Sequence, residues 1–424
     1  MKKKVIVKAP ALSASGYGEH ARFVLRSLRA REDLFDIYLH NITWGKTSWI
    51  FEDSEERQWM DQLIKKTAEY LQERQGKPAF DISLQVTIPN EFEKIATKNI
   101  GVTAGIETNK VSPQWLEKVN QMDKLVVVSN HAKYGFEATT YPMYNNEKVH
   151  VADLKCEVPI EVVGYPVREF DQADVDFKFD TSFNFLTVAL WGQRKNMVKN
   201  IENFVEEFKD EEDVGLILKT SLTSGSTYDK IQMRRVINSI LAKYPERKCK
   251  VYLLHGRLSE NEMATLYQHE SVKCMLSLAH GEGFGLPLFE AACVGLPIIA
   301  PDWSGQIDFL YAPQKDKKGK EKMKGMFAKV AYDLRLVQQE SVWEGVLQKD
   351  SMWAYPKDSS AKQKMREVYK NYPIAVKKAK TLKEHVHTAF ASDVMHEKMA
   401  TAAYPEEERK LHDEINDMFE ELNL

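Results

Sequence analysis

Two carboxylates flank a glycine-rich turn in the segment 280–301, and they are the clearest chemical signal in the chain. Glu282 and Glu290 are separated by seven residues, and the turn between them runs into a predicted helix. Gly283 and Gly285 have no Cβ that would keep an anion from the backbone N–H groups. A phosphate at such a helix start meets unpaired amides and the positive end of the helix dipole. Carboxylates repel phosphate but accept hydrogen bonds from sugar hydroxyls, so the segment predicts a nucleotide-sugar site.

The same segment predicts its own secondary structure. Pro287 suits the first position of a helix, where its missing N–H costs nothing. Gly295 falls where a left-handed cap would end that helix. The apolar residues 296–300 are then typical of a buried strand.

The string Glu282–Ala291, followed by Val294–Ala300, resembles the donor-binding signature of retaining glycosyltransferases of family 4, the group-1 type. The resemblance implies an α/β fold of the GT-B type, with two Rossmann-like, doubly wound domains facing across a cleft. It implies that Glu290 binds the nucleotide ribose and that Glu282 contacts the donor sugar. The diphosphate would lie against the backbone of Gly283, Phe284, Gly285 and Leu286. The alternative is an ordinary helix N-terminus with acidic neighbours, which the helix dipole favours.

A basic pair follows a predicted strand and opens a helix. Arg194 and Lys195 stand in the string Trp191–Met197, which is similar to an Arg-Lys-Asn element of the same family. The resemblance implies that Lys195 neutralises the donor diphosphate, with Arg194 as its assistant, and so stabilises the leaving group. The family often has a Gly-Arg pair about six residues earlier, where this chain has Ala189-Leu190. The source of a second cation therefore stays open, as does the alternative of an exposed basic helix start.

The first strand–helix turn contains two glycines. Gly16 and Gly18 lie within Ser15–His20, which lacks the third glycine of the dinucleotide-binding fingerprint. In the resembling family this loop closes over the donor phosphates, which would make both glycines backbone contacts. A tight turn without a ligand is the alternative.

Polar residues follow two further strands of the first half. Glu107 stands near the place where many relatives have a histidine that faces the transferred sugar. Its carboxylate would hydrogen-bond the acceptor or steady positive charge, unless it forms a structural ion pair, for example with Lys110. The residues after the next strand, Ser129, Asn130 and His131, are candidates for binding the acceptor.

A lysine-rich segment interrupts the second half of the chain. Six of the ten residues Lys315–Lys324 are lysines, and the segment predicts a hydrophilic hairpin or loop. A solvated loop is the simplest interpretation. The sharper hypothesis is that the segment docks a phosphate-rich acceptor.

Composition limits the class of protein. A chain of 424 residues predicts two domains, and a formal net charge of −3 predicts no general affinity for polyanions. The four cysteines show no paired spacing, so neither a zinc site nor a disulfide framework is expected. No apolar run is long enough for a membrane span, and the start Met1–Lys8 favours a first strand over a secretory signal. We therefore expect a cytoplasmic protein.

Strands alternate with helices along both halves, which predicts parallel sheets covered on both faces. The Asp-rich stretch Glu169–Thr181 is the best linker candidate. We predict an acceptor-binding domain over 1–170 and a nucleotide-sugar-binding domain over 171–385. The resemblance implies that 386–424 forms helices that pack back on the first domain.

The resulting hypothesis is a retaining glycosyltransferase that moves a hexose or pentose from a nucleoside-diphosphate sugar to an acceptor hydroxyl. The resemblance implies front-face displacement without a metal or other cofactor. An Asp-x-Asp pair, the metal signature of another transferase fold, occurs only in the linker at Asp174–Asp176. The acceptor would be a glycan, a small molecule or modified DNA.

Three alternatives remain open. The first is a DNA glycosyltransferase acting on hydroxymethylated bases of the phage type. The second is a non-catalytic nucleotide-sugar-binding protein on the same fold. The third is a phosphorylase-like enzyme with pyridoxal phosphate, for which no lysine is marked.

Overall fold

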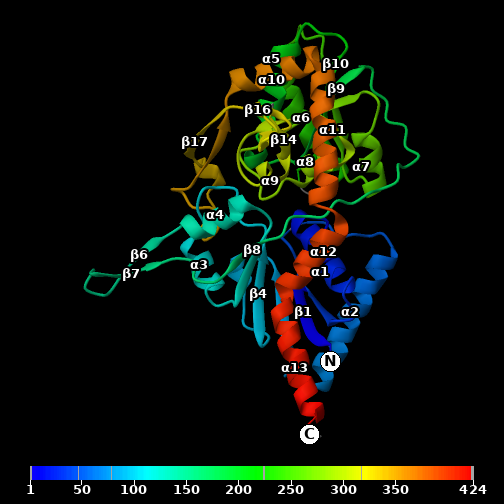
Figure 1. Cartoon of the computed structure of the whole chain (residues 1–424). Helices are drawn as coiled ribbons and strands as arrows, with labels where there is room; N and C mark the ends of the chain where they lie inside the picture. The colour runs from blue at the N-terminus through cyan, green and yellow to red at the C-terminus, as the bar shows by residue number, and fades with distance from the viewer. Residues whose placement is uncertain (1, 46, 78, 223–224, 317, 422–424) are drawn as a thin grey trace.

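The computed structural model describes residues 2–45, 47–77, 79–222, 225–316 and 318–421, so Lys317 and the predicted helical residues 422–424 lie outside the described residues. Two lobes are stacked one above the other, and each is built on a six-stranded parallel sheet (Figure 1). The alternation of strands and helices predicted this α/β arrangement. The division of the chain at residues 170 and 385 stays a prediction.

The first sheet has the strand order β2-β1-β3-β4-β5-β8. Its strands are β1 (Lys3–Ala9), β2 (Phe35–Asn41), β3 (Ile82–Val86), β4 (Lys98–Thr103), β5 (Lys124–Val127) and β8 (Ile160–Val162). Its helices are α1 (Gly16–Arg29), α2 (Glu55–Glu73), α3 (Pro113–Val119) and α4 (Asn130–Ala138).

The second sheet has the strand order β11-β10-β9-β12-β13-β16. Its strands are β9 (Phe183–Leu190), β10 (Val214–Ser221), β11 (Lys250–His255), β12 (Val272–Leu276), β13 (Ile298–Pro301) and β16 (Ala328–Val330). The helices of this lobe are α5 (Met197–Phe208), α6 (Thr227–Leu241), α7 (Glu260–Tyr267), α8 (Leu286–Val294), α9 (Ile307–Leu310) and α10 (Asp358–Lys370). The predicted linker 169–181 contains no helix or strand.

Strand order determines where a ligand can bind. The order reverses between β1 and β3 in the first sheet and between β9 and β12 in the second. Ligands of doubly wound sheets bind at the carboxyl ends of strands beside such a reversal. Gly16, Lys195 and Glu282 follow β1, β9 and β12, so the topology places all three at these ends.

Helix α8 has the predicted ends. Gly285 is its N-cap with φ +98°, and Gly295 is its C-cap with φ +80°, both in the left-handed region that favours glycine. Pro287 occupies the second helical position, one later than predicted, because the left-handed Gly285 starts the helix at Leu286. The strand after the cap is β13.

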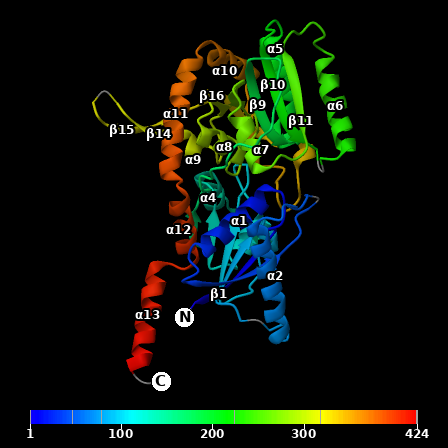
Figure 2. The same cartoon turned by 90° about the vertical axis from the view of Figure 1, so that its right-hand side faces the viewer.

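The last helices return to the first lobe (Figures 1 and 2). Helix α11 (Tyr372–Ala389) packs on α8 of the second lobe and leads to α12 (Ser392–Ala403) and α13 (Glu406–Glu421), which lie on the first lobe. Arg31 pairs with Glu397 at 2.9 Å, and Lys124 Nζ donates to the carbonyl of Ala402 at 3.0 Å. The expected return of the C-terminal helices is confirmed.

Among the described residues, three antiparallel strand pairs lie outside the two main sheets. They are β6 (Tyr141–Tyr144) with β7 (His150–Leu154), β14 (Tyr311–Lys315) with β15 (Glu321–Gly325), and β17 (Tyr332–Leu336) with β18 (Met352–Pro356). Figure 1 shows β6–β7 projecting from the first lobe, and Figure 2 shows β14–β15 projecting from the second. The lysine-rich segment therefore forms a hairpin, one of the two predicted outcomes.

One hydrophobic cluster continues from the first lobe into the second. Phe284, from the loop before α8, packs its ring against Tyr165, which follows β8, and Phe390 after α11, with centroids 5.1 and 6.1 Å apart. This aromatic contact holds the glycine-rich turn against the junction of the lobes. No helix of the described residues is long and apolar enough to cross a lipid bilayer.

Candidate functional site

A buried ion cluster surrounds Glu282, which follows β12 and is 8% exposed. Lys195 Nζ lies 2.5 Å from Oε1 of this carboxylate, and Arg194 Nη1 lies 2.9 Å from Oε2. Burial alone would raise the pKa of Glu282, but Lys195 and Arg194 together hold it below its usual value. Glu282 is therefore an ionised acceptor with both oxygens engaged.

Glu107 joins this cluster from the first lobe. Arg194 Nε lies 3.2 Å from Glu107 Oε1, so one guanidinium bridges a carboxylate of each lobe. Lys110, the partner suggested from the sequence, pairs with Asp350 instead. That suggestion was wrong because Lys110 is next to Glu107 only along the chain, whereas the closed lobes bring Arg194 to it.

The loop after β13 fixes the backbone of Glu282. The N–H of Glu282 donates to Ser304 Oγ at 2.9 Å, and the N–H of Gly305 donates to the carbonyl of Glu282, also at 2.9 Å. A Cβ on Gly305 would lie 1.8 Å from the carbonyl oxygen of Gly283, so only glycine fits there. These contacts hold the glycine-rich turn in one conformation.

The turn leaves backbone donors unused. Among the described residues, none accepts a hydrogen bond from the N–H groups of Phe284, Gly285 or Leu286. Pro287 has no N–H, and the first bonds to Gly285 come from Leu288 and Phe289 at 2.9 Å. The start of α8 therefore presents unpaired amides, as an anion site requires.

A cavity of about 750 Å³ opens between the lobes beside this turn. Its wall includes Gly16 from the first lobe and Leu190, Leu286 and Glu290 from the second. Leu190 is 57% exposed, so an apolar side chain stands in the cavity where the resembling family often has arginine.

Glu290 lies on the wall of this cavity. Its side chain is exposed to the cavity, and its carboxylate accepts one hydrogen bond, at 2.8 Å, from the hydroxyl of Tyr267. The protein walls around this carboxylate remove part of its hydration, which raises the pKa of Glu290 to about 7, against the effect of the Tyr267 hydrogen bond and with a further contribution from Glu19. Unlike Glu282, this carboxylate has no cation within ion-pair distance among the described residues.

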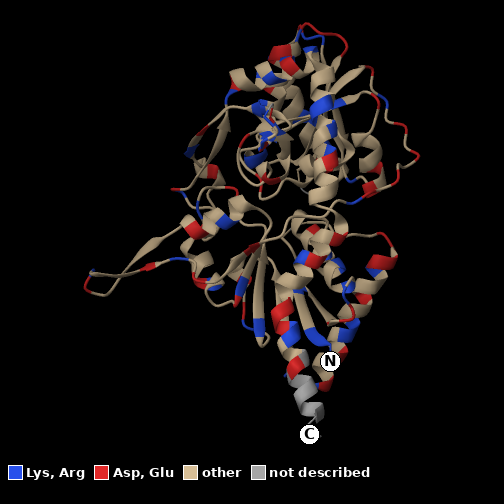
Figure 3. Cartoon of the chain, viewed as in Figure 1, with Lys and Arg blue, Asp and Glu red and all other residues tan. Residues whose placement is uncertain are grey.

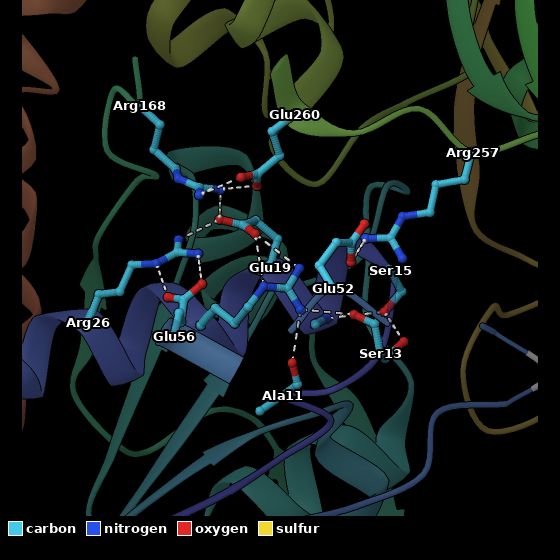
Figure 4. Close-up of polar contacts among 12 residues, drawn as sticks. Ala11, Ser13, Ser15, Glu19, Arg26, Glu52, Glu56, Arg168, Arg257 and Glu260 are labelled. Atoms are coloured by element: carbon cyan, nitrogen blue, oxygen red, sulfur yellow. Dashed lines mark hydrogen bonds and ion pairs between the residues drawn. The ribbon is translucent and has the colours of Figure 1, made fainter. Parts of the chain in front are cut away.

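Ion pairs link the lobes across the cavity (Figure 4). Arg168 Nη1 lies 2.8 Å from Glu19 of α1 and 2.6 Å from Glu260 of α7. Arg257 and Glu52 form a second link at 2.9 Å. Sequence reasoning missed these residues, because no local pattern marks charged residues that meet only after the lobes have packed together.

The two predicted glycines of the first turn have different surroundings. Gly16 lies on the cavity wall, with nothing within 4 Å of an added Cβ. The N–H of Gly18 donates to Ser15 Oγ, which caps α1, and a Cβ on Gly18 would lie 1.9 Å from the carbonyl oxygen of Ser13. Local packing explains Gly18, whereas only Gly16 faces the cavity.

The candidate acceptor residues lie where the lobes meet. Ser129 Oγ donates to the carbonyl of Gly283 at 2.7 Å, and the N–H of Asn130 donates to Asp308 at 2.7 Å. The ring of His131 packs edge-on against Trp303, and burial lowers the pKa of this histidine to about 4. Ser129 and Asn130 therefore use their polar groups to join the lobes.

None of the four cysteines is in a disulfide. Cys249, Cys274 and Cys293 are buried, and Cys293 lies on the cavity wall. Across the part of the chain that the structure describes, no three or more His, Cys, Asp or Glu side chains are grouped so as to hold a metal ion.

Comparison with known proteins identifies the class. Residues 193–312 match the sequence family described as glycosyl transferases group 1. No curated protein matches the sequence.

Solved structures of glycosyltransferases share the fold. A sucrose-phosphate synthase from Thermosynechococcus elongatus has a TM-score of 0.60 at 13% identity, over 94% of this chain and 98% of the other. A glycosyltransferase from Rickettsia africae has a TM-score of 0.57 at 12% identity, over 95% and 99%. HepE from Anabaena, solved with UDP and glucose, has a TM-score of 0.54 at 10% identity, over 94% and 98%.

The chain is a glycosyltransferase with the GT-B fold. The expected fold class is thereby confirmed, and the family match supports glycosyl transfer from a nucleotide sugar.

Proposed function

We propose that this protein is a retaining glycosyltransferase of the family-4 type that transfers a hexose or pentose from a nucleoside-diphosphate sugar to an acceptor hydroxyl. The observation that carries the proposal is the arrangement around α8. Unpaired amides lie at the helix start, a cation-bound carboxylate lies before it, and a second carboxylate faces the cavity.

The donor would bind across both ends of this arrangement. Glu290 would accept hydrogen bonds from the ribose hydroxyls in the cavity. The amides of Phe284, Gly285 and Leu286 would bind the diphosphate, with Gly16 facing it from the first lobe. Glu282 would accept hydrogen bonds from the sugar.

The ion cluster would change partners when the donor binds. Without a donor, Lys195 and Arg194 are balanced by Glu282 and Glu107. An incoming diphosphate competes with Glu282 for the ammonium of Lys195, and the carboxylate oxygens of Glu282 become available for sugar hydroxyls. Positioned cations of this kind stabilise the charge that develops on the departing diphosphate.

The reaction would be a front-face displacement. The bond between the anomeric carbon and the phosphate oxygen breaks, and the acceptor oxygen bonds to the same face of that carbon. The acceptor proton passes to the departing phosphate oxygen. Arg194 holds Glu107, which would steady the positive charge on the sugar, and His131 would lie near the acceptor. Lys195 and the amides of α8 would carry the diphosphate charge without a metal ion.

Donor hydrolysis tests this proposal without knowledge of the acceptor. Purified protein is titrated with UDP, GDP and ADP in EDTA, and slow hydrolysis of the matching nucleotide sugar is followed by NMR. We expect selective binding of one nucleotide and a first-formed sugar with the anomeric configuration of the donor. Inverted sugar would refute retention, and failure to bind any nucleotide would refute the donor site.

The free thiols of the chain suit a reducing compartment, so we place the reaction in the cytoplasm.

A further inference from the structure

The hairpin β14–β15 concentrates positive charge on a protein whose net charge is −3. Elsewhere, basic and acidic residues are interspersed over both lobes (Figure 3). The segment 315–324 has six lysines against two acidic residues. Each of the described lysines of this segment, Lys315, Lys318, Lys320, Lys322 and Lys324, is exposed. No ion pair occupies any of these five side chains within the described part of the chain.

Strand pairing orders these lysines. Lys322 lies opposite Gln314, and Lys324 lies opposite Ala312, so both lysines share one face of the hairpin. Side chains two residues apart on a strand are about 7 Å apart. The hairpin thus presents two neighbouring ammonium groups on this face, with Lys315 on the opposite face. Within the described part of the chain, its two strands pair with each other and with no other strand.

The base of the hairpin is joined to the ion cluster. Tyr311, at the start of β14, donates from its hydroxyl to Asp302 at 2.7 Å. Asp302 begins the loop in which Ser304 accepts the N–H of Glu282. Asp308, in helix α9 directly after this loop, accepts a hydrogen bond from the N–H of Asn130 of the first lobe. A polymer held on the hairpin would therefore be anchored to the element that rims the cluster.

We propose that β14–β15 is the docking arm for a DNA acceptor, with its lysines on the phosphodiester backbone. The inference rests on the proposed function and names its acceptor class. A two-stranded ribbon has the width to enter the major groove of duplex DNA, and its lysines would neutralise phosphates there. A membrane surface fits less well, because stable membrane binding usually needs several apolar anchors, and Met323 is the exposed large apolar side chain of the ribbon. Because the protein as a whole has a net charge of −3, we expect DNA to be attracted by the arm and not by the rest of the surface.

A matched pair of charge variants tests the arm. The first combines Lys320→Gln, Lys322→Gln and Lys324→Gln. The control combines Lys230→Gln, Arg234→Gln and Arg235→Gln on α6, which lies on the opposite side of the second lobe from the hairpin (Figure 2). Both variants remove three positive charges from exposed positions.

Binding of a fluorescent DNA duplex of mixed sequence is measured by anisotropy over a range of salt concentrations. Each lost phosphate contact lowers the slope of log affinity against log salt by about one. We expect the hairpin variant to lower that slope by about 3 and the control to match the wild type. Equal weakening in both variants, or no binding by the wild type, would overturn the proposal. Binding of phosphatidylserine vesicles through the hairpin without DNA binding would overturn it as well.

A separate readout distinguishes this inference from the proposed function. Nucleotide-induced stabilisation of the same variants is followed in a thermal melt, since a ligand of the native state raises the melting temperature. We expect the hairpin variant to keep the wild-type shift. A nucleotide shift without DNA binding would refute the docking arm alone, whereas DNA binding without any nucleotide shift would refute the donor site.

Discussion

Glu282 and Glu290 belong to one short motif but have opposite surroundings. Both oxygens of Glu282 are bound to cations, and its pKa is lowered. Glu290 has one neutral hydrogen-bond donor, Tyr267, and its pKa is raised to about 7. The folded protein therefore supplies partners for both oxygens of Glu282, whereas Glu290 faces the cavity with one hydrogen-bond donor.

The difference indicates that the two carboxylates of the motif have different roles in binding the donor. A satisfied carboxylate contributes to the native state before any ligand arrives, and a ligand must displace its partners. A carboxylate removed from water without enough hydrogen-bond donors costs free energy, and a ligand that donates hydrogen bonds to it reduces that cost. The Glu282 end is therefore the pre-organised part of the site, and the Glu290 end is the part that a nucleotide completes.

The largest effect is expected at the satisfied end. Lys195→Ala should reduce kcat of donor hydrolysis about 10²- to 10³-fold, because a cation aimed at the leaving group is lost. Lys199→Ala, at a half-exposed lysine on α5, is the control and should keep the wild-type rate. A wild-type kcat in the Lys195 variant would remove this residue from the mechanism.

The next effect is expected at the unsatisfied end. Glu290→Ala should weaken nucleotide binding about 10- to 100-fold, because hydrogen bonds to a charged acceptor contribute about 1.5–3 kcal/mol. Calorimetric titration measures the change. Glu107→Gln is the comparison and should leave nucleotide affinity close to wild type, since the proposal assigns Glu107 to the transferred sugar and not to the nucleotide. Unchanged affinity in the Glu290 variant would contradict its assignment to the ribose.

The raised pKa of Glu290 predicts a pH effect on the donor. Lowering the pH through about 7 protonates this carboxyl, which then accepts hydrogen bonds less well, so affinity for a nucleotide sugar should fall. Nucleotide sugars suit this titration because their diphosphate does not titrate near pH 7. The Glu290→Gln variant should show no such dependence, and an equal dependence in both proteins would assign it to another group.

The free energy of unfolding should change in the opposite direction to donor affinity as the pH is lowered through about 7. Between the usual pKa of a glutamate and about 7, the folded state binds the proton of Glu290 more tightly than the unfolded state does. The contribution of this group to the free energy of unfolding therefore rises as the pH falls through that window. Urea unfolding of the wild type and of Glu290→Gln at several pH values measures this contribution as the difference between their free energies of unfolding.

The smallest effects are expected at the ion pairs that link the lobes. Arg168→Met should lower the free energy of unfolding by about 1 kcal/mol, because one guanidinium bridges two carboxylates. Arg257→Met, in the more exposed pair with Glu52, should cost less than about 0.5 kcal/mol. Urea unfolding compares the two, and the reverse order would show that Arg168 does not hold the lobes together.

Local patterns were sufficient for the elements that carry the site. The ends of α8 follow from glycines at 285 and 295, because capping acts over a few residues. Strands β2 and β8 and the hairpin β6–β7 were among the elements that were missed. The exposed hairpin β6–β7 has no buried face, and therefore no apolar pattern marks it.

The sequence by itself determined the alternation of strands and helices, the motif that joins Glu282 to Glu290, and the basic pair at Arg194 and Lys195. Only the tertiary structure decided which charges meet. Arg194 bridges Glu107 and Glu282, and Arg168 bridges Glu19 and Glu260, because strands and helices far apart along the chain come together when the lobes close. Electrostatic pairing depends on distance in space and on burial, and neither can be read from spacing along the chain.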